Sequence, residues 1–359
     1  MHTFFASKDY TFINSNYGSR NNNFMGVGIA FPTKKFAAKM VDLSVVSDSK
    51  SGGWQGARTE APPSTDVGSS TATATPSVVE QISSWFANLF SGAPDCAPAK
   101  RSNGGAGASE VDESTESWNL VRSRFNVVVC VRLRPLGGGD GAAASNAAEA
   151  AAKSEDDSRD VVVATYHTPC VFWNPAAMTV CCALVAQRVQ MLTEGRFPYI
   201  LAGDFNVKPT SPAYSLFTTG SFAPEVDDAE DAKVHGKRAF PAKPCYADDK
   251  WTYALPRGTM RSAYAEAMGR EPLFTNYAKT AGMDTTFAST IDYIFFADGA
   301  KHKGQTARLK ATSADSLDET CAAIKGKCVS LPNEDEPSDH LLIAADFALE
   351  VDKAPPAKP

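Results

Sequence analysis

The chain has 359 residues, of which 43% are hydrophobic and 21% charged, and its net charge at pH 7 is −6. These proportions are close to those of an average soluble protein, so they exclude a chain that is disordered throughout. The negative net charge excludes a broadly basic surface for nucleic acid, so any such binding has to be local.

Segments rich in β-branched and aromatic residues predict strands along the whole chain. Several are apolar at nearly every position, which indicates that both faces of the sheet are covered. Between two of them, residues 178–193 carry apolar side chains at helical spacing, which predicts a helix over one face. Mixed strands and helices favour an α/β layered domain over an all-β sandwich. The predicted strands are 27–31, 127–131, 161–166, 199–202, 291–296 and 341–347.

Two low-complexity segments interrupt this pattern. Residues 47–117 are dominated by Ser, Thr, Gly, Ala and Pro, and residues 137–160 are rich in Gly and Ala before turning acidic. Neither can bury enough apolar surface to offset its conformational entropy, so both are predicted to be disordered insertions. Because strands flank them on both sides, they interrupt one domain of residues 1–349, which a disordered tail of residues 350–359 follows.

A short stretch inside the first insertion has the pattern of an amphipathic helix. Ser77 and Glu80 form a capping box after Pro76, and apolar residues then repeat at helical spacing as far as Phe90. Segment 77–91 could dock on a partner protein, or it could fold back onto its own domain, as apolar stripes generally do. The sequence leaves both alternatives open.

The cysteines show no metal-binding motif, and the N-terminal residues show no recognisable targeting signal. None of the eight cysteines stands in a C-x-x-C pair, so we expect reduced thiols and no zinc site. Lys8 and Asp9 interrupt the stretch where a signal peptide would be apolar, and no run approaches the ~20 apolar residues of a membrane span. The sequence therefore predicts a cytoplasmic protein without a membrane span, with the nucleus as the alternative compartment.

The strongest local motif is Gly-Asp-Phe-Asn at residues 203–206, directly after an apolar strand. Such a strand delivers the Asp204 carboxylate and the Asn206 carboxamide to the same edge of a sheet. Asp204 could activate a water molecule or hold a metal ion, and Asn206 could donate to a phosphate oxygen. An Asp at a strand end can also simply form a turn or cap a helix.

Further polar residues stand at the ends of other predicted strands. Asp292 interrupts an apolar run, where a carboxylate is costly unless it is paired, and His340 is its natural partner. His340 could act as a general base or stabilise a transition state, whereas in the alternative Asp292 pairs only with backbone donors. His167 ends another strand. These ends predict one rim where a phosphodiester meets a divalent cation, and oxygen-rich ligation favours Mg²⁺ or Mn²⁺.

The motifs GDFN, TIDYIFF and PSDHLLIAADF, in this order, resemble the signature of the endonuclease/exonuclease/phosphatase (DNase I-like) superfamily. Segments 261–264, 271–277 and 331–333 narrow the resemblance to its deadenylase branch, which includes nocturnin, angel proteins and the catalytic subunits of the carbon catabolite repressor complex. The resemblance implies a four-layered α/β sandwich and a metal-dependent phosphodiester hydrolase. The activity it implies is 3′-to-5′ exoribonuclease action on poly(A)-type RNA 3′ ends, with release of 5′-AMP.

The resemblance also implies a role for particular residues. Asp292 would orient His340, His340 would act on the attacked phosphate, and His167 would stabilise the phosphate. The implied catalytic residues are Asp204, Asn206, His340, Asp292 and His167.

Binding roles follow from the same resemblance. Mg²⁺, with Mn²⁺ as the alternative, would be held by Asp204 and Asp339. Phe274 and Pro175 would contact an adenine base, and Asn276 would bind substrate. Phe274 could instead be an ordinary core residue.

One departure from the family pattern leads to a further expectation. Family members place a strand ending in Gln-Glu before the region matched here, and that Glu is the main metal ligand. The first glutamate of this chain is Glu60, inside the low-complexity segment, so we expect a fold that is incomplete at its N-terminus and binds metal weakly. The alternatives to an active exoribonuclease are a catalytically inactive scaffold of the same fold and a phosphatase acting on a small nucleotide or lipid headgroup.

Overall fold

The fold is taken from a computed structural model that describes residues 1–17, 25–45, 113–137, 156–221, 251–279, 286–302, 304–327, 331–334 and 336–352. The predicted amphipathic segment 77–91 lies outside the described residues. So does most of each predicted insertion.

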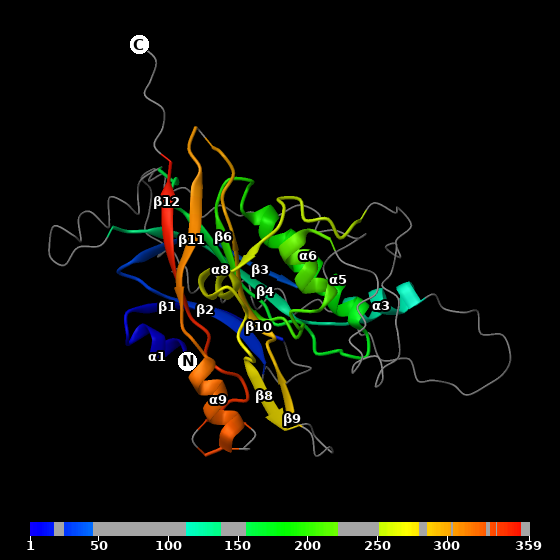
Figure 1. The fold of residues 1–359 in the computed structure, drawn as a ribbon. Coiled ribbons are helices and arrows are strands. Elements are labelled where there is room, and N and C mark those ends of the chain that lie inside the picture. Colours follow the sequence, from blue (N-terminus) through cyan, green and yellow to red (C-terminus); the bar gives the residue numbers. More distant parts are fainter. Residues whose placement is uncertain are drawn as a thin grey trace, which may run out of the picture.

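A six-stranded sheet forms the centre of the fold (Figure 1). It contains β3 (Phe36–Val45), β4 (Val127–Pro135), β5 (Val161–Thr165), β6 (Tyr199–Asp204), β7 (Arg261–Ser262) and β10 (Asp292–Ala297). The spatial order is β3-β4-β5-β6-β10-β7, with β5 and β6 parallel and the other neighbours antiparallel. Parallel neighbours need a crossover connection, and α5 (Pro175–Leu192) supplies it.

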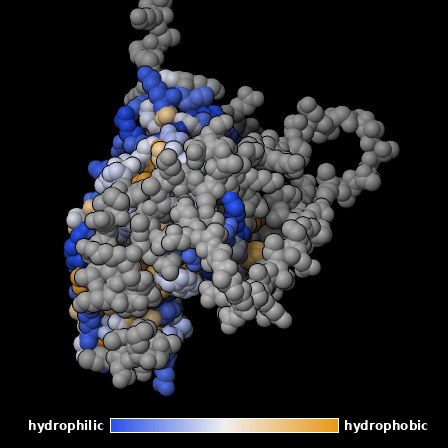
Figure 2. Space-filling view, turned by 90° about the vertical axis from the view of Figure 1, so that its right-hand side faces the viewer, coloured by the Kyte–Doolittle hydropathy of each residue, from blue (hydrophilic) through white to orange (hydrophobic). Residues whose placement is uncertain are grey.

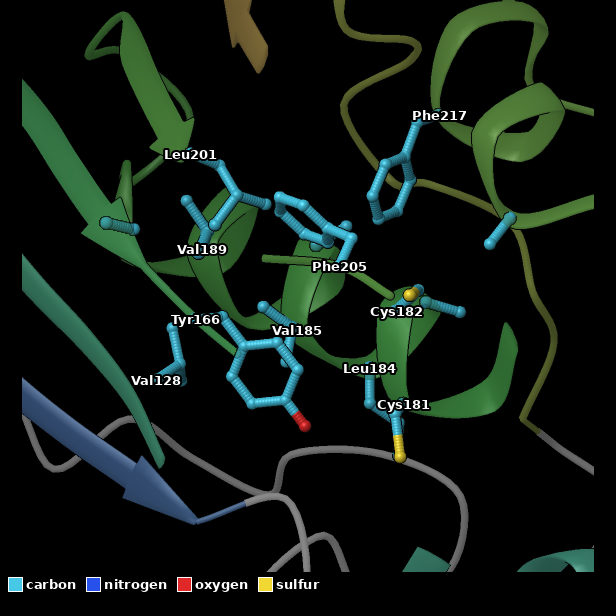
Figure 3. Close-up of a cluster of buried hydrophobic side chains, with 14 of the residues drawn as sticks. Val128, Tyr166, Cys181, Cys182, Leu184, Val185, Val189, Leu201, Phe205 and Phe217 are labelled. Atoms are coloured by element: carbon cyan, nitrogen blue, oxygen red, sulfur yellow. The ribbon is translucent and has the colours of Figure 1, made fainter. Parts of the chain in front are cut away.

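Helices cover one face of this sheet. α5 begins at Pro175 because Asn174 caps it, accepting a hydrogen bond from the Ala177 amide at 2.9 Å. α3 (Glu113–Arg122) and α6 (Pro212–Thr219) pack beside α5. In the core between helix and sheet, Val185 and Val189 of α5 lie beside Leu201 and Phe205 (Figure 3). Burial of this apolar helix against the sheet contributes hydrophobic stabilisation to the fold.

The length and composition of α5 would allow it to cross a membrane. However, 83% of its apolar window is buried inside the protein. The core helix of a soluble protein meets the same criterion, so α5 gives only weak support for a membrane span.

Two strand pairs cover the other face of the central sheet. β1 (Tyr10–Asn16) pairs with β2 (Gly26–Pro32), and β11 (Ala307–Ala314) pairs with β12 (Ala345–Val351), both antiparallel. The first pair packs on β4 through Ile13, Ile29 and Phe31. The second packs on Phe296 of β10 through Leu309, Ala311 and Phe347. Side chains of a strand alternate between its two faces, which explains how one sheet supports both cores.

Shorter elements complete the fold. α1 (His2–Ala6) lies on the outer side of β1, where the Phe5 and Phe12 rings stack with centroids 4.5 Å apart. The remaining described elements are α8 (Ala263–Met268), the hairpin of β8 (Asn276–Lys279) and β9 (Thr286–Ser289), and α9 (Asp318–Lys327). Helices, sheet, strand pairs and α1 are therefore successive layers, and the prediction of an α/β sandwich is confirmed.

Several predicted boundaries are wrong. Residues 113–117 belong to α3 and not to an insertion, because Trp118 is buried against Trp251 with ring centroids 4.9 Å apart. β12 begins at Ala345 and not at residue 341, and it runs to Val351, so residues 350 and 351 are not part of a tail. The described cysteines are free, as predicted.

The described residues visible on the face shown in Figure 2 are mostly hydrophilic, and the hydrophobic ones among them occur in small separate patches. Scattered apolar residues of this kind are normal on a protein surface.

Asp160 anchors the end of the second predicted insertion. Its carboxylate is fully buried and accepts hydrogen bonds from Nε and Nη2 of Arg134 at 2.6 and 3.0 Å. Asp160→Ala would leave the Arg134 guanidinium buried without this carboxylate, so we expect the free energy of unfolding to fall by about 3–5 kcal/mol in urea denaturation. Lys34→Ala, which removes an equally short but exposed ion pair with Asp9, should leave the denaturation midpoint unchanged. Equal effects of the two substitutions would contradict this account.

Candidate active site

The site begins with the register of two neighbouring strands. β6 ends at Asp204, β10 begins at Asp292, and the two residues are direct partners in the antiparallel pairing. Directly opposite residues have their Cβ atoms about 4.5–5.5 Å apart and point to the same face of the sheet. The fold therefore brings two carboxylates together at one end of the central sheet.

His340 joins these carboxylates. Its Nδ1 lies 2.8 Å from Oδ2 of Asp292, and its Nε2 lies 3.8 Å from Oδ2 of Asp204. The backbone of His340 forms an isolated β-bridge with Asn276, which fixes the segment against β8. The structure thus brings Asp292 and His340 together, as the sequence predicts.

The glycine of the Gly-Asp-Phe-Asn motif permits close contact between β5 and β6. Gly203 has a φ of +151°, and a Cβ atom at this position would overlap the carbonyl oxygen of Tyr166. Any other residue would push the end of β6 away from β5. Gly203 therefore sets the position of Asp204 relative to the end of β5.

Asn206 turns the chain after Asp204. It has a φ of +53°, in the left-handed region that Asn tolerates better than most residues. Its backbone N–H donates to Oδ1 of Asp204 at 2.8 Å, and its Nδ2 donates to the carbonyl oxygen of Thr168 at 2.9 Å. Asn206 thus ties Asp204 to the loop after β5, and donation to a phosphate stays a prediction.

His167 reaches the same carboxylate from the end of β5. Its Nε2 lies 3.5 Å from Oδ2 of Asp204, and its carbonyl oxygen accepts a hydrogen bond from Nδ2 of Asn126 at 2.7 Å. The predicted catalytic residues therefore gather around Asp204.

Burial and mutual charge alter the proton affinities in this cluster. Burial, followed by the charge of Asp292, raises the pKa of Asp204 to about 7. The hydrogen bond to Asp292 raises the pKa of His340 to about 9, whereas burial and then the charge of His340 lower the pKa of His167. At neutral pH, without another cation, His340 is charged and His167 is neutral.

The donor set fits a hard divalent cation. Asp204, Asp292 and His340 each offer a ligand atom, and these atoms lie within 4.8 Å of one another. Within the described part of the chain, the ionisable groups at ion-pair distance from Asp204 are the two imidazoles. Two partly buried carboxylates so close together repel each other, and a cation between them removes that repulsion. Their oxygen donors suit Mg²⁺ or Mn²⁺.

Asp339 and Asn276 contact each other beside His340. Oδ2 of Asp339 accepts a hydrogen bond from Nδ2 of Asn276 at 3.2 Å, and Asp339 is not among the grouped ligand atoms. Asn276 is buried, with its side chain on Asp339 and its backbone against His340. This pair therefore lies against the His340 segment, and metal ligation by Asp339 and substrate binding by Asn276 stay predictions.

The predicted adenine contact of Phe274 is wrong for this structure. Its side chain has no exposed surface, and it packs against the Tyr277 ring with centroids 5.0 Å apart, while Nζ of Lys325 in α9 lies 5.5 Å from its centroid. A ring without a free face cannot stack on a base, so Phe274 belongs to the core. Pro175 is the first residue of α5, a position that explains a proline without any ligand, and its adenine contact stays a prediction.

Thr275 is a further residue of this cluster that the sequence motifs do not single out. The hydroxyl of this fully buried residue donates to Oδ2 of Asp292 at 2.7 Å. Thr275 lies inside the motif of residues 271–277, but an uncharged residue in an apolar stretch gives no sign of a carboxylate partner seventeen residues later.

The amino-acid sequence is similar to those of known proteins. The profile of the Endonuclease/Exonuclease/phosphatase family matches residues 6–340. The chain is 29% identical over 173 residues to the CCR4-Not complex 3′-5′-exoribonuclease subunit Ccr4 of Coccidioides immitis (strain RS), covering 48% of this chain and 19% of that protein. It is 25% identical over 237 residues to Carbon catabolite repressor protein 4 homolog 3 of Arabidopsis thaliana, covering 54% and 48%. The chain thus spans less than half the length of either relative.

A solved structure shows the same fold. The crystal structure of ANGEL2, a 2′,3′-cyclic phosphatase, in complex with adenosine-2′,3′-vanadate matches 96% of this chain and 76% of its own, with a TM-score of 0.50 and 17% identity. At this identity the likeness concerns the fold alone. It agrees with the DNase I-like sandwich that the sequence predicts.

Proposed function

Since this chain belongs to the Endonuclease/Exonuclease/phosphatase family, we propose that it is a divalent-metal-dependent phosphodiester hydrolase that shortens RNA from the 3′ end. The observation that carries the proposal is the convergence of Asp204, Asp292 and His340, whose ligand atoms lie within 4.8 Å of one another. Paired carboxylates beside an imidazole can hold a cation and act on a phosphate in one place. The 3′-to-5′ exoribonuclease activity is proposed from the activity named for the fungal relative. The release of 5′-AMP and a preference for poly(A) are proposed from the resemblance of the sequence motifs to the deadenylase branch.

Asp204 and Asp292 would hold the cation, which when bound stabilises the negative charge that develops on a phosphate under attack. Asp292 accepts the hydrogen bond from Nδ1 of His340, and this directs Nε2 toward the Asp204 side of the site. In the metal-free protein the hydrogen bond to Asp292 raises the pKa of His340 to about 9, so the ring is protonated at neutral pH, and in this form it can donate to a phosphate oxygen. His340 therefore suits stabilisation of the transition state better than the role of general base.

Asp204 would accept a proton, and His167 would donate a hydrogen bond to the phosphate. The pKa of Asp204 is about 7 in the metal-free protein, and a bound cation would lower it. The Asp204 carboxylate would then be charged at neutral pH and able to accept a proton from an attacking water molecule. The lowered pKa of His167 keeps its ring neutral, so one ring nitrogen can donate to phosphate without adding a charge.

Binding of Mg²⁺ is expected to stabilise the 359-residue chain. A cation that binds only the folded state stabilises it by about 2.7 kcal/mol at a hundred times its dissociation constant. Differential scanning calorimetry should show a Tm that rises with Mg²⁺ and falls back when EDTA is added. The Asp204→Asn variant should show little of this rise, because one of the two carboxylates is gone. An equal rise in the variant would place the bound cation elsewhere.

The products of hydrolysis test the proposed function. We expect the chain with Mg²⁺ to shorten a 5′-labelled RNA carrying a 3′ oligo(A) tract one nucleotide at a time, with 5′-AMP as the small product. A matched RNA ending in oligo(U) should be shortened more slowly. Release of inorganic phosphate from a nucleotide or lipid headgroup, with RNA left intact, would establish the phosphatase alternative. If neither substrate reacts although metal binds, the proposed function is wrong and a binding role remains.

A further inference from the structure

Thr275 lies between the two acidic strand ends and the His340 segment. Its side chain is fully buried, and its hydroxyl has three partners. Oγ1 accepts hydrogen bonds from the backbone N–H groups of Ile291 and Asp292 at 3.0 and 3.1 Å, and it donates to Oδ2 of Asp292 at 2.7 Å. A threonine hydroxyl offers one hydrogen and two lone pairs, so these three bonds use its whole capacity.

We infer that Thr275 is a positioning residue that fixes the direction of hydrogen bonding through Asp292 and thereby the orientation of His340. Backbone N–H groups can only donate, so they occupy both lone pairs of the hydroxyl. The single hydroxyl hydrogen must then point at Oδ2 of Asp292, which accepts it as a carboxylate oxygen. His340 Nδ1 lies 2.8 Å from the same oxygen, and because a carboxylate can only accept, Nδ1 donates. The inference deepens the proposed function and rests on it.

The orientation of His340 follows from this chain of bonds. With Nδ1–H directed at Asp292, the remaining ring nitrogen, Nε2, faces Oδ2 of Asp204 at 3.8 Å. The backbone of Thr275 holds the same segment, because its carbonyl oxygen accepts a hydrogen bond from the N–H of Leu341 at 2.7 Å. Thr275 therefore holds both members of the Asp292–His340 pair, one through its side chain and the other through its backbone.

Removal of the hydroxyl would do more than delete one bond. Thr275→Val keeps the shape and the backbone bonds but leaves the N–H groups of Ile291 and Asp292 buried without an acceptor. The Asp292 carboxylate, whose Oδ2 lies 2.7 Å from the same hydroxyl oxygen, is an acceptor beside them. We expect this carboxylate to rotate toward the two N–H groups and away from His340, whose ring then loses its anchor.

Matched substitutions isolate the hydroxyl. Thr275→Ser restores the donor in a smaller side chain. Thr290→Val is the control, because Thr290 is also buried and its hydroxyl donates to the carbonyl oxygen of Pro272 at 2.6 Å rather than to a carboxylate. In the metal-free protein, the NMR signal of the proton on Nδ1 of His340 should persist in wild type, Thr275→Ser and Thr290→Val, and it should be lost to exchange in Thr275→Val. In RNA hydrolysis, Thr275→Val should lower kcat by about tenfold to a hundredfold at unchanged KM.

The two readouts separate the possible failures. Persistence of the Nδ1 proton signal in Thr275→Val, or its equal loss in Thr290→Val, would overturn the positioning role whatever the activity. Absence of the signal in Thr275→Ser would also overturn the positioning role. If even the wild-type chain hydrolyses no RNA, the proposed function fails, and the NMR comparison still decides whether Thr275 orients His340.

Discussion

Asp204→Asn is expected to lower kcat/KM for RNA by about a thousandfold or more, the size of effect seen when a general base or an ion-holding carboxylate is removed. Asn keeps the shape of the side chain and can still accept the hydrogen bond from the Asn206 amide. It cannot accept a proton from water or balance the charge of a cation. The measurement is steady-state hydrolysis with saturating Mg²⁺. Asp352→Asn, which replaces an exposed carboxylate paired with Arg308, should retain full activity.

The same substitution should stabilise the metal-free protein at alkaline pH. The pKa of Asp204 is raised from 3.8 to about 7 in the folded state, so the folded state binds this proton more tightly than the unfolded state. The resulting stability is complete below pH 3.8 and is lost as the pH rises through 7. Asn is free of this dependence, so Asp204→Asn should gain in Tm relative to wild type as the pH rises from 5 to 8 without metal. A gap that shrinks over this range would contradict the raised pKa.

His340→Gln is expected to lower kcat by about a hundredfold to ten-thousandfold, because Gln supplies a neutral amide where the imidazolium donates to phosphate. The effect should fall mainly on kcat, since the positive charge matters most when charge develops on the phosphate. His302→Gln, which replaces an exposed histidine outside the site, is the control. Equal activity of the two variants would exclude His340 from the chemistry.

The stability of this variant should depend on pH in a defined way. The pKa of His340 is raised from 6.5 to about 9 by its hydrogen bond to Asp292. Its contribution to stability is therefore complete below pH 6.5 and is lost as the pH rises through 9. Urea denaturation of the metal-free proteins should show wild type more stable than His340→Gln at pH 6, with the difference gone at pH 10. A stability difference that stays constant from pH 6 to pH 10 would mean that the hydrogen bond to Asp292 does not raise the pKa of His340.

The parts of the fold that could be predicted are those with a strong local signal. The strand before Asp204 and the helix over the sheet are long and apolar, so their pattern is enough to find them. The apolar spacing predicts the start of α5 three residues too late, although Asn174 and Pro175 are typical helix-start residues. β7 has only two residues and depends on pairing with β10, which no local pattern reveals.

Some residues of the site could likewise be predicted from the sequence, and others could not. Asp204, Asp292 and His340 stand out because a charge or imidazole beside an apolar strand needs a reason. Phe274 and Thr275 could not be placed, because their roles depend on distant parts of the chain. The position of α9 beside Phe274 makes that ring part of the core, and the position of β10 makes the Thr275 hydroxyl a donor to Asp292. Thus the charged groups could be predicted, whereas the buried residues that orient them required the tertiary structure.

The position of a divalent cation in crystals of the 359-residue chain grown with Mn²⁺ tests the central claim most directly. An anomalous difference map should show Mn²⁺ at coordination distance from the carboxylate oxygens of both Asp204 and Asp292, beside the His340 ring, and no peak there in Asp204→Asn crystals. A saturated wild-type crystal without Mn²⁺ between these two carboxylates would contradict the account.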